Sequence, residues 1–68
     1  MPKAPRLTAS DAESLLLKAG FELWRSKGSH RIYGKGEFRI TVPFHSGRVL
    51  HPKIVKQVVE TIAEAAGR

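Results

Sequence analysis

The spacing of apolar residues changes twice along the chain, and this constrains the fold more than any other feature. Between residues 12 and 19 apolar side chains recur every three or four positions, as on one face of a helix. From residue 21 to residue 42 they alternate with polar ones, as in strands that bury one face. After Pro52 the helical spacing returns. The sequence predicts a helix, a group of strands and a second helix.

Turn and cap signals set the boundaries of these elements. Turns are predicted at Lys27-Gly28 and at Gly34-Lys35-Gly36, and two short turns join three strands into an antiparallel sheet. Thr8 is a predicted N-cap of the first helix and Gly20 its left-handed end, while Pro52 suits the first turn of the second helix. We expect a small single-domain α+β fold of order α-β-β-β-α, with both helices on one face of a three-stranded antiparallel sheet.

The same periodicities assign residues to the core and to the surface. The strand residues expected to face the core are Phe21, Leu23, Phe38, Ile40 and Val42, and those expected to face outward are Trp24, Arg39 and Thr41. Ile32 and Tyr33 point to opposite faces, so either could be buried. The apolar stripe expected on the second helix consists of Ile54, Val55, Val58, Val59, Ile62 and Ala66.

The chain has 68 residues, enough for one domain with a modest core. Residues 1–6 hold two prolines and little to bury, so we expect a flexible arm there and a single domain over residues 7–68. A domain this small has no room for a deep pocket. We expect it to bind its partner on an open face or in a shallow groove.

The charge balance is strongly basic, with 12 Lys and Arg residues against 6 Asp and Glu and a formal net charge of +6. Such an excess attracts polyanions, so nucleic acid is the leading expected partner. Ordinary solubilising charge and a membrane surface are the alternatives. The membrane alternative is weaker, because neither predicted helix pairs a basic face with a bulky apolar one.

The chain contains no cysteine, which excludes a disulfide framework and a thiolate metal site and fits a cytoplasmic location. It shows no long apolar span and no signal-type segment. The carboxylates are dispersed, the three histidines lack zinc-site spacing, and there is no phosphate-binding glycine loop. We therefore expect no metal and no cofactor.

A histidine in a basic setting remains as the candidate for chemistry. RNA can be cut without metal, because its 2′-hydroxyl can attack the adjacent phosphate when a group of near-neutral pKa moves the proton. His30 follows a predicted turn, at a strand start flanked by Arg25, Lys27 and Arg31. Judged by position alone, a histidine at a strand start is more often a solvated or hydrogen-bonded residue than a catalyst.

Other candidates also have two interpretations. Trp24 could stack on a base, or be packed by a helix end or a partner protein. Lys27, Arg31, Lys35 and Arg39 could follow a phosphate backbone or be solvated charges. His45 lies in a predicted loop, where it could contact a partner or serve a turn, and His51 neighbours Pro52 at a helix start.

Two motifs suggest a family. They are Gly20-Phe21, Arg25, Lys27-Gly28-Ser29-His30 and Tyr33, followed by Val42-Pro43-Phe44-His45 with Gly47, Arg48 and Leu50. This pattern resembles the HicA toxins of toxin–antitoxin pairs over nearly the whole chain. The sequence departs from the family where many members carry a second histidine, here Arg31, and at residues 51–55, which replace the usual entry to the second helix.

The resemblance implies a fold like that of double-stranded-RNA-binding domains, ribosome-independent cleavage of mRNA, and inhibition by a HicB-type antitoxin. It also implies that His30 is the catalytic residue. Gly28 would permit the sharp turn, and Ser29 would orient the strand start or contact phosphate. The residues we expect to bind RNA are Arg25, Lys27, Gly28, Ser29, Arg31 and Arg39.

Three hypotheses follow from the sequence. In the first, the chain is an endoribonuclease toxin in which His30 is the general acid or base. In the second, it is a basic nucleic-acid-binding module without catalysis. In the third, its basic face meets an acidic protein partner.

Overall fold

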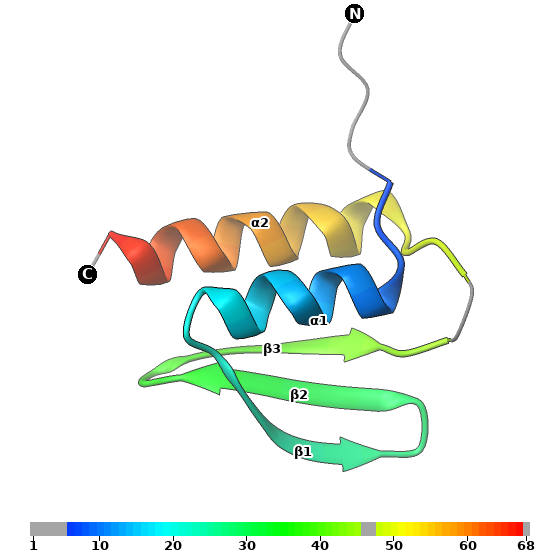
Figure 1. The fold of residues 1–68 in the computed structure, drawn as a ribbon, viewed down its shortest axis with the longest axis horizontal. Helices are drawn as coiled ribbons and strands as arrows, with labels where there is room; N and C mark the ends of the chain where they lie inside the picture. The colour runs from blue at the N-terminus through cyan, green and yellow to red at the C-terminus, as the bar shows by residue number, and fades with distance from the viewer. Residues whose placement is uncertain (1–5, 46–47, 68) are drawn as a thin grey trace, which may run out of the picture.

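The computed structural model describes residues 6–45 and 48–67, so most of the predicted N-terminal arm lies outside the described residues. The elements follow the predicted order α-β-β-β-α (Figure 1). They are α1 (Ala9–Lys18), β1 (Glu22–Lys27), β2 (His30–Lys35), β3 (Phe38–Pro43) and α2 (Pro52–Ala66).

The three strands form one antiparallel sheet in the order β1-β2-β3, as the two short turns require. Both helices lie beside β3, and β1 is the strand farthest from them (Figure 1). All six residues of β1 are exposed. In the part of the chain that the structure describes, the helices partly cover one face of the sheet and none lies on the other, which we call the open face.

The predicted helix ends are confirmed. The Thr8 hydroxyl accepts a hydrogen bond from the Asp11 backbone N–H at 3.1 Å, and the Asp11 carboxylate accepts one from the Thr8 N–H at 3.1 Å. Gly20 has φ 96°, a conformation that side chains with a Cβ rarely adopt. Pro52 begins α2, and the His51 Nδ1 accepts a hydrogen bond from the Lys53 N–H at 3.0 Å.

The hydrophobic core lies between the helices and the inner face of β2 and β3. Its buried residues are Ala9, Ala12, Leu16, Phe21, Tyr33, Ile40, Val42, Leu50, Val55, Val58 and Ala65. Of the two candidates in β2, Tyr33 is fully buried and Ile32 is half-buried. The structure thus confirms Phe21, Ile40 and Val42 as core residues, and leaves Phe38 half-buried against them.

Three residues predicted to be buried are exposed. Leu23 is 45% exposed, because β1 extends beyond the area that the helices cover. On α2, Val59 is 47% exposed and Ala66 is also exposed, while Ala65 is buried in the core.

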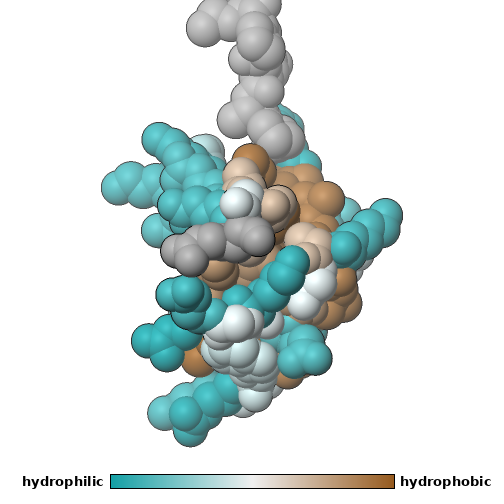
Figure 2. Space-filling view, turned by 90° about the vertical axis from the view of Figure 1, so that its left-hand side faces the viewer, coloured by the Kyte–Doolittle hydropathy of each residue, from teal (hydrophilic) through white to brown (hydrophobic). Residues whose placement is uncertain are grey.

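Figure 2 shows hydrophobic surface mainly on the right-hand side of that view, and hydrophilic side chains along its left and lower edges. Within the described residues, no helix is long and apolar enough to cross a membrane.

The turn predicted at residues 34–36 is present but lies later in the chain, because Gly34 and Lys35 belong to β2 and the chain turns at Gly36 and Glu37. The register of β1 against β2 shifts between Leu23 and Arg25, which leaves Trp24 as an extra residue. A Cβ added at Gly34 would lie 2.3 Å from the Trp24 indole. Gly34 is needed in this strand because the indole occupies the space of a side chain.

We predict that Gly34→Ala destabilises the wild-type protein by about 1 kcal/mol, because the methyl group and the indole compete for one space. In a Trp24→Ala background the same substitution should be neutral or stabilise by about 0.5 kcal/mol, since the obstacle is gone and alanine reduces the freedom of the unfolded chain. Thermal unfolding of the four proteins of this cycle measures the difference. A cost that is equal in both backgrounds would contradict the packing described here.

Candidate functional site

His30 is the first residue of β2 and follows the tight turn at Gly28 and Ser29. Gly28 has φ 58°, so this turn requires the left-handed conformation that glycine adopts without strain. The His30 side chain is exposed, and the residue pairs with Lys27 on β1 and with Pro43 on β3. A central strand with partners on both sides thus presents the imidazole at one end of the sheet.

Strand geometry assigns His30 to the open face. The Tyr33 hydroxyl contacts a carboxylate on α1, so Tyr33 faces the helices. Successive side chains of a strand point to opposite faces, and His30, Ile32 and Gly34 therefore share the open face. Their paired residues on β1 and β3 share it too, and these are Lys27, Arg25, Glu22, Pro43, Thr41 and Arg39.

Three of the predicted RNA-binding cations lie on this open face. Lys27 is directly opposite His30, and Arg25 is opposite Ile32, two residues along β2. Arg39 is opposite Gly34, at the other end of β2 and about 13 Å from His30 along the strand. All three side chains are exposed. The face therefore carries positive charge along its length, with two cations near the imidazole.

Arg31 points to the other face of the sheet. Its Nη1 donates a hydrogen bond to the Glu13 Oε2 at 3.0 Å, and its Cζ lies 3.9 Å from the centroid of the Phe44 ring. The hydrogen bond to Glu13 raises the pKa of Arg31. The guanidinium of Arg31 thus already contacts Glu13 and Phe44. The predicted role of Arg31 in RNA binding stays a prediction.

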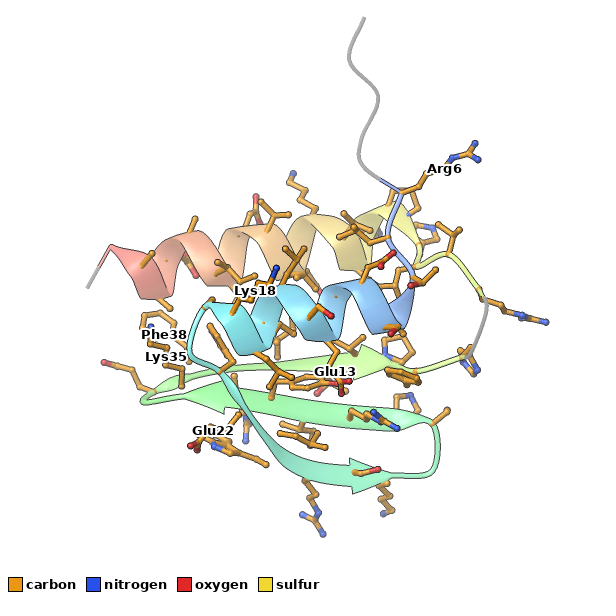
Figure 3. The ribbon with its side chains drawn as sticks, in the orientation of Figure 1. Arg6, Glu13, Lys18, Glu22, Lys35 and Phe38 are labelled. Carbon is orange, nitrogen blue, oxygen red and sulfur yellow. The ribbon has the colours of Figure 1, made fainter. Side chains whose placement is uncertain are left out.

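Glu13 joins α1 to β2. Its Oε2 also accepts a hydrogen bond from the Tyr33 hydroxyl at 2.5 Å, and Figure 3 shows Glu13 extending from α1 toward the sheet. Burial, and next the hydrogen bond to Glu13, raise the pKa of Tyr33 to about 12. One carboxylate thus fixes two residues of β2, and one of these follows His30 directly.

A second contact holds the turn before His30. The Phe44 backbone N–H donates a hydrogen bond to the Ser29 carbonyl oxygen at 2.5 Å, which joins the segment after β3 to the turn before β2. The Phe44 ring lies against Arg31, the residue after His30. His30 is therefore held between two residues that both contact Phe44.

The other two histidines lie elsewhere. His51 caps α2, as its place before Pro52 suggested. His45 lines a cavity of about 240 Å³ together with Arg48 and His51. Within residues 6–45 and 48–67, no three His, Asp or Glu side chains come together as potential metal ligands. The histidines do not form one cluster.

The sequence interpretation missed the contacts of Glu13, which it counted only among the dispersed carboxylates. A signal was present, since Glu13 lies four residues after Ala9 and three before Leu16, and both of these are buried. An acidic residue on the buried face of a helix needs partners there. The pairing with Tyr33 and Arg31 depends on how α1 crosses the sheet, which sequence spacing does not specify.

Comparison with protein families gives a match that covers most of the chain. The family described as HicA toxin of bacterial toxin-antitoxin matches residues 9–67, a range that runs from the start of α1 to the end of α2 and includes His30. No curated protein and no solved structure matches the chain. The likeness to double-stranded-RNA-binding domains therefore stays a prediction.

We predict that Glu13→Ala lowers the free energy of unfolding by about 2–3 kcal/mol, because it leaves the buried Tyr33 hydroxyl without its partner. Glu60→Ala, at an exposed position of α2, should change stability by less than about 0.5 kcal/mol. Chemical denaturation of both variants measures the difference. Equal effects would show that Glu13 does not stabilise the packing of α1 on the sheet.

We predict that Tyr33, the single tyrosine of the chain, ionises near pH 12 in the folded protein and near its ordinary pKa of 10.0 when unfolded. The folded-state pKa is the higher one, so the stability that Tyr33 contributes is complete below pH 10 and is lost as the pH rises through about 12. Tyrosinate absorbance in native buffer and in denaturant measures both midpoints. A native midpoint near 10 would contradict the burial and hydrogen bonding of the hydroxyl.

Proposed function

The chain belongs to the HicA toxin family of bacterial toxin–antitoxin systems, and on this basis we propose that it is an endoribonuclease that cleaves mRNA. We propose that His30 is its catalytic general acid or base and that no metal takes part. The observation that carries the proposal is the placement of His30, exposed at the end of the open face with Lys27 opposite it.

The reaction that fits this site uses the nucleophile that RNA carries. The ribose 2′-oxygen attacks the adjacent phosphorus and loses its proton, the bond from phosphorus to the 5′-oxygen breaks, and the 5′-oxygen gains a proton. The products are a 2′,3′-cyclic phosphate and a 5′-hydroxyl. An imidazole suits either proton transfer, because histidine titrates near neutral pH.

The groups around His30 have different roles in this proposal. Lys27 and Arg25 are placed to hold the phosphate that reacts, while the distant Arg39 is placed to hold RNA further along the sheet. The Ser29 carbonyl already accepts the Phe44 N–H, so we expect Ser29 and Gly28 to contact phosphate through their donors. Arg31 is a positioning residue that steadies the start of β2 through Glu13 and Phe44.

The family also implies a partner, because its members are toxins of toxin–antitoxin systems. We propose that this partner is a HicB-type antitoxin, and that it inhibits cleavage by preventing RNA from reaching His30. We further propose that the protein acts in the cytoplasm, where mRNA is found. A basic surface around the active site would attract both an RNA chain and an acidic inhibitor.

We predict that His30→Ala lowers the rate of mRNA cleavage by about 10²–10⁴-fold while RNA binding persists, because the substitution removes the proton-transfer group and leaves the cations. His51→Asn is the matched control. Asparagine also caps helices, and His51 lies outside the proposed site, so this variant should cleave like the wild type.

Cleavage of a purified transcript measures both variants, and growth after expression in cells gives a second readout. Equal cleavage by the wild type and His30→Ala would exclude His30 as the catalytic group. Tight RNA binding without cleavage by the wild type would favour a non-catalytic RNA-binding module instead.

A further inference from the structure

Trp24 lies on the open face with one side of its ring against the sheet. A Cβ at Gly34 would lie 2.3 Å from both Cη2 and Cζ3 of the indole and 2.4 Å from Cδ2. Cη2 and Cδ2 are opposite atoms of the six-membered ring, so near-equal distances place Gly34 beneath the ring face and not beside its edge. The side chain is nevertheless 49% exposed. One ring face therefore rests on the strand backbone, and the other is available to a ligand.

We propose that this free ring face binds an unpaired base of the RNA, so that the open face of the sheet holds a single-stranded stretch of the substrate. The inference rests on the proposed function and specifies the substrate of that same site. Flat aromatic side chains on open sheets bind unpaired bases by stacking, and every base has a face that can stack.

The charges around Trp24 favour a nucleic acid. Arg25 follows it in the chain, and Arg39 lies on the same face across β2, opposite Gly34. The acidic residue Glu22 also lies on this face, on β1 and directly opposite Gly34. With Lys27 the face carries three cations against that one acid among the paired residues, which suits a phosphate backbone following the bases.

The distance between Trp24 and His30 indicates how the RNA would lie on the open face. Gly34, beneath the indole, lies four residues after His30 on β2, a distance of about 13 Å along the strand. Half-buried Ile32 lies between them on the same face, and Arg25 is opposite it. A strand of RNA with its reacting phosphate at His30 would cross Arg25 and place a nearby base on Trp24.

A duplex does not fit this surface equally well. In a double helix each base is stacked between its neighbours, so its face is not available to an indole. We therefore expect cleavage in unpaired segments, with the stacked base at a constant number of nucleotides from the cut.

The test uses the fluorescence of Trp24, which is the single tryptophan of the chain, in the full-length His30→Ala protein so that the RNA stays intact. Three probes are titrated: a short oligoadenylate, a ribose-phosphate strand of the same length without bases, and an RNA duplex. We expect the oligoadenylate to quench the fluorescence, and the other two to bind through charge with little quenching.

Substitutions then measure the contribution of the ring by an RNA-binding assay with a labelled oligoadenylate. Trp24→Ala should weaken binding about tenfold, and Trp24→Phe should weaken it less because a stacking ring remains. Leu23→Ala is the matched control, since Leu23 is 45% exposed on the same strand but on the other face, and it should bind like its parent. Circular dichroism shows whether each variant is folded, and the phenylalanine variant tests stacking if the alanine variant does not fold.

Equal quenching by the strand without bases, or equal affinity of Trp24→Ala and its parent, would overturn the proposal. Loss of antitoxin binding with unchanged RNA binding would also overturn it, in favour of a protein contact at Trp24. These outcomes are distinct from failure of the nuclease proposal. A protein that cleaves RNA but shows no stacking refutes only the role of Trp24, and one that stacks bases but does not cleave refutes only the role of His30.

Discussion

The carboxylate of Glu13 is the constraint on which the rest of this small structure depends. It accepts hydrogen bonds from the Tyr33 hydroxyl and from Arg31, so a single group of α1 fixes two inward-facing positions of β2. A fully buried tyrosine hydroxyl needs a partner, and a carboxylate between a helix and a sheet needs donors. Glu13, Tyr33 and Arg31 satisfy one another in a single cluster. This cluster fixes the position of α1 over the sheet and opposes a shift in the register of β2.

The open face follows from that arrangement. Once Tyr33 and Arg31 point toward α1, alternation along β2 places His30, Ile32 and Gly34 on the other side, where no helix packs. The paired residues of β1 and β3 add three cations to that side. A domain too small for a deep pocket thus has an extended basic surface with an imidazole at one end and an indole at the other. Such a surface suits a long, flexible polyanion better than a small molecule.

Much of this could be predicted from the sequence, because the signals are local. The order of helices and strands, the Thr8 cap, Gly20, the turn at Gly28 and the proline that begins α2 each depend on a few neighbouring residues, and each of these predictions is confirmed. The errors concern contacts between elements. Leu23 has the pattern of a core residue but lies on a strand that extends beyond the helices, and Gly34 looks like a turn residue but makes room for Trp24. At the candidate site, the sequence indicated His30 and the neighbouring cations, whose roles stay predictions, whereas the opposite orientation of Arg31 becomes visible only when the strands are paired.

The central claim is that an imidazole and surrounding cations suffice to cut RNA through its own 2′-hydroxyl. Mass spectrometry of the fragments left by the purified wild-type protein, with a chelator present throughout, tests it most directly. The account predicts fragments ending in 2′,3′-cyclic phosphate, with new 5′-hydroxyl ends, at an undiminished rate. Fragments with 3′-hydroxyl and 5′-phosphate ends, or cleavage that stops when divalent metal is removed, would contradict it.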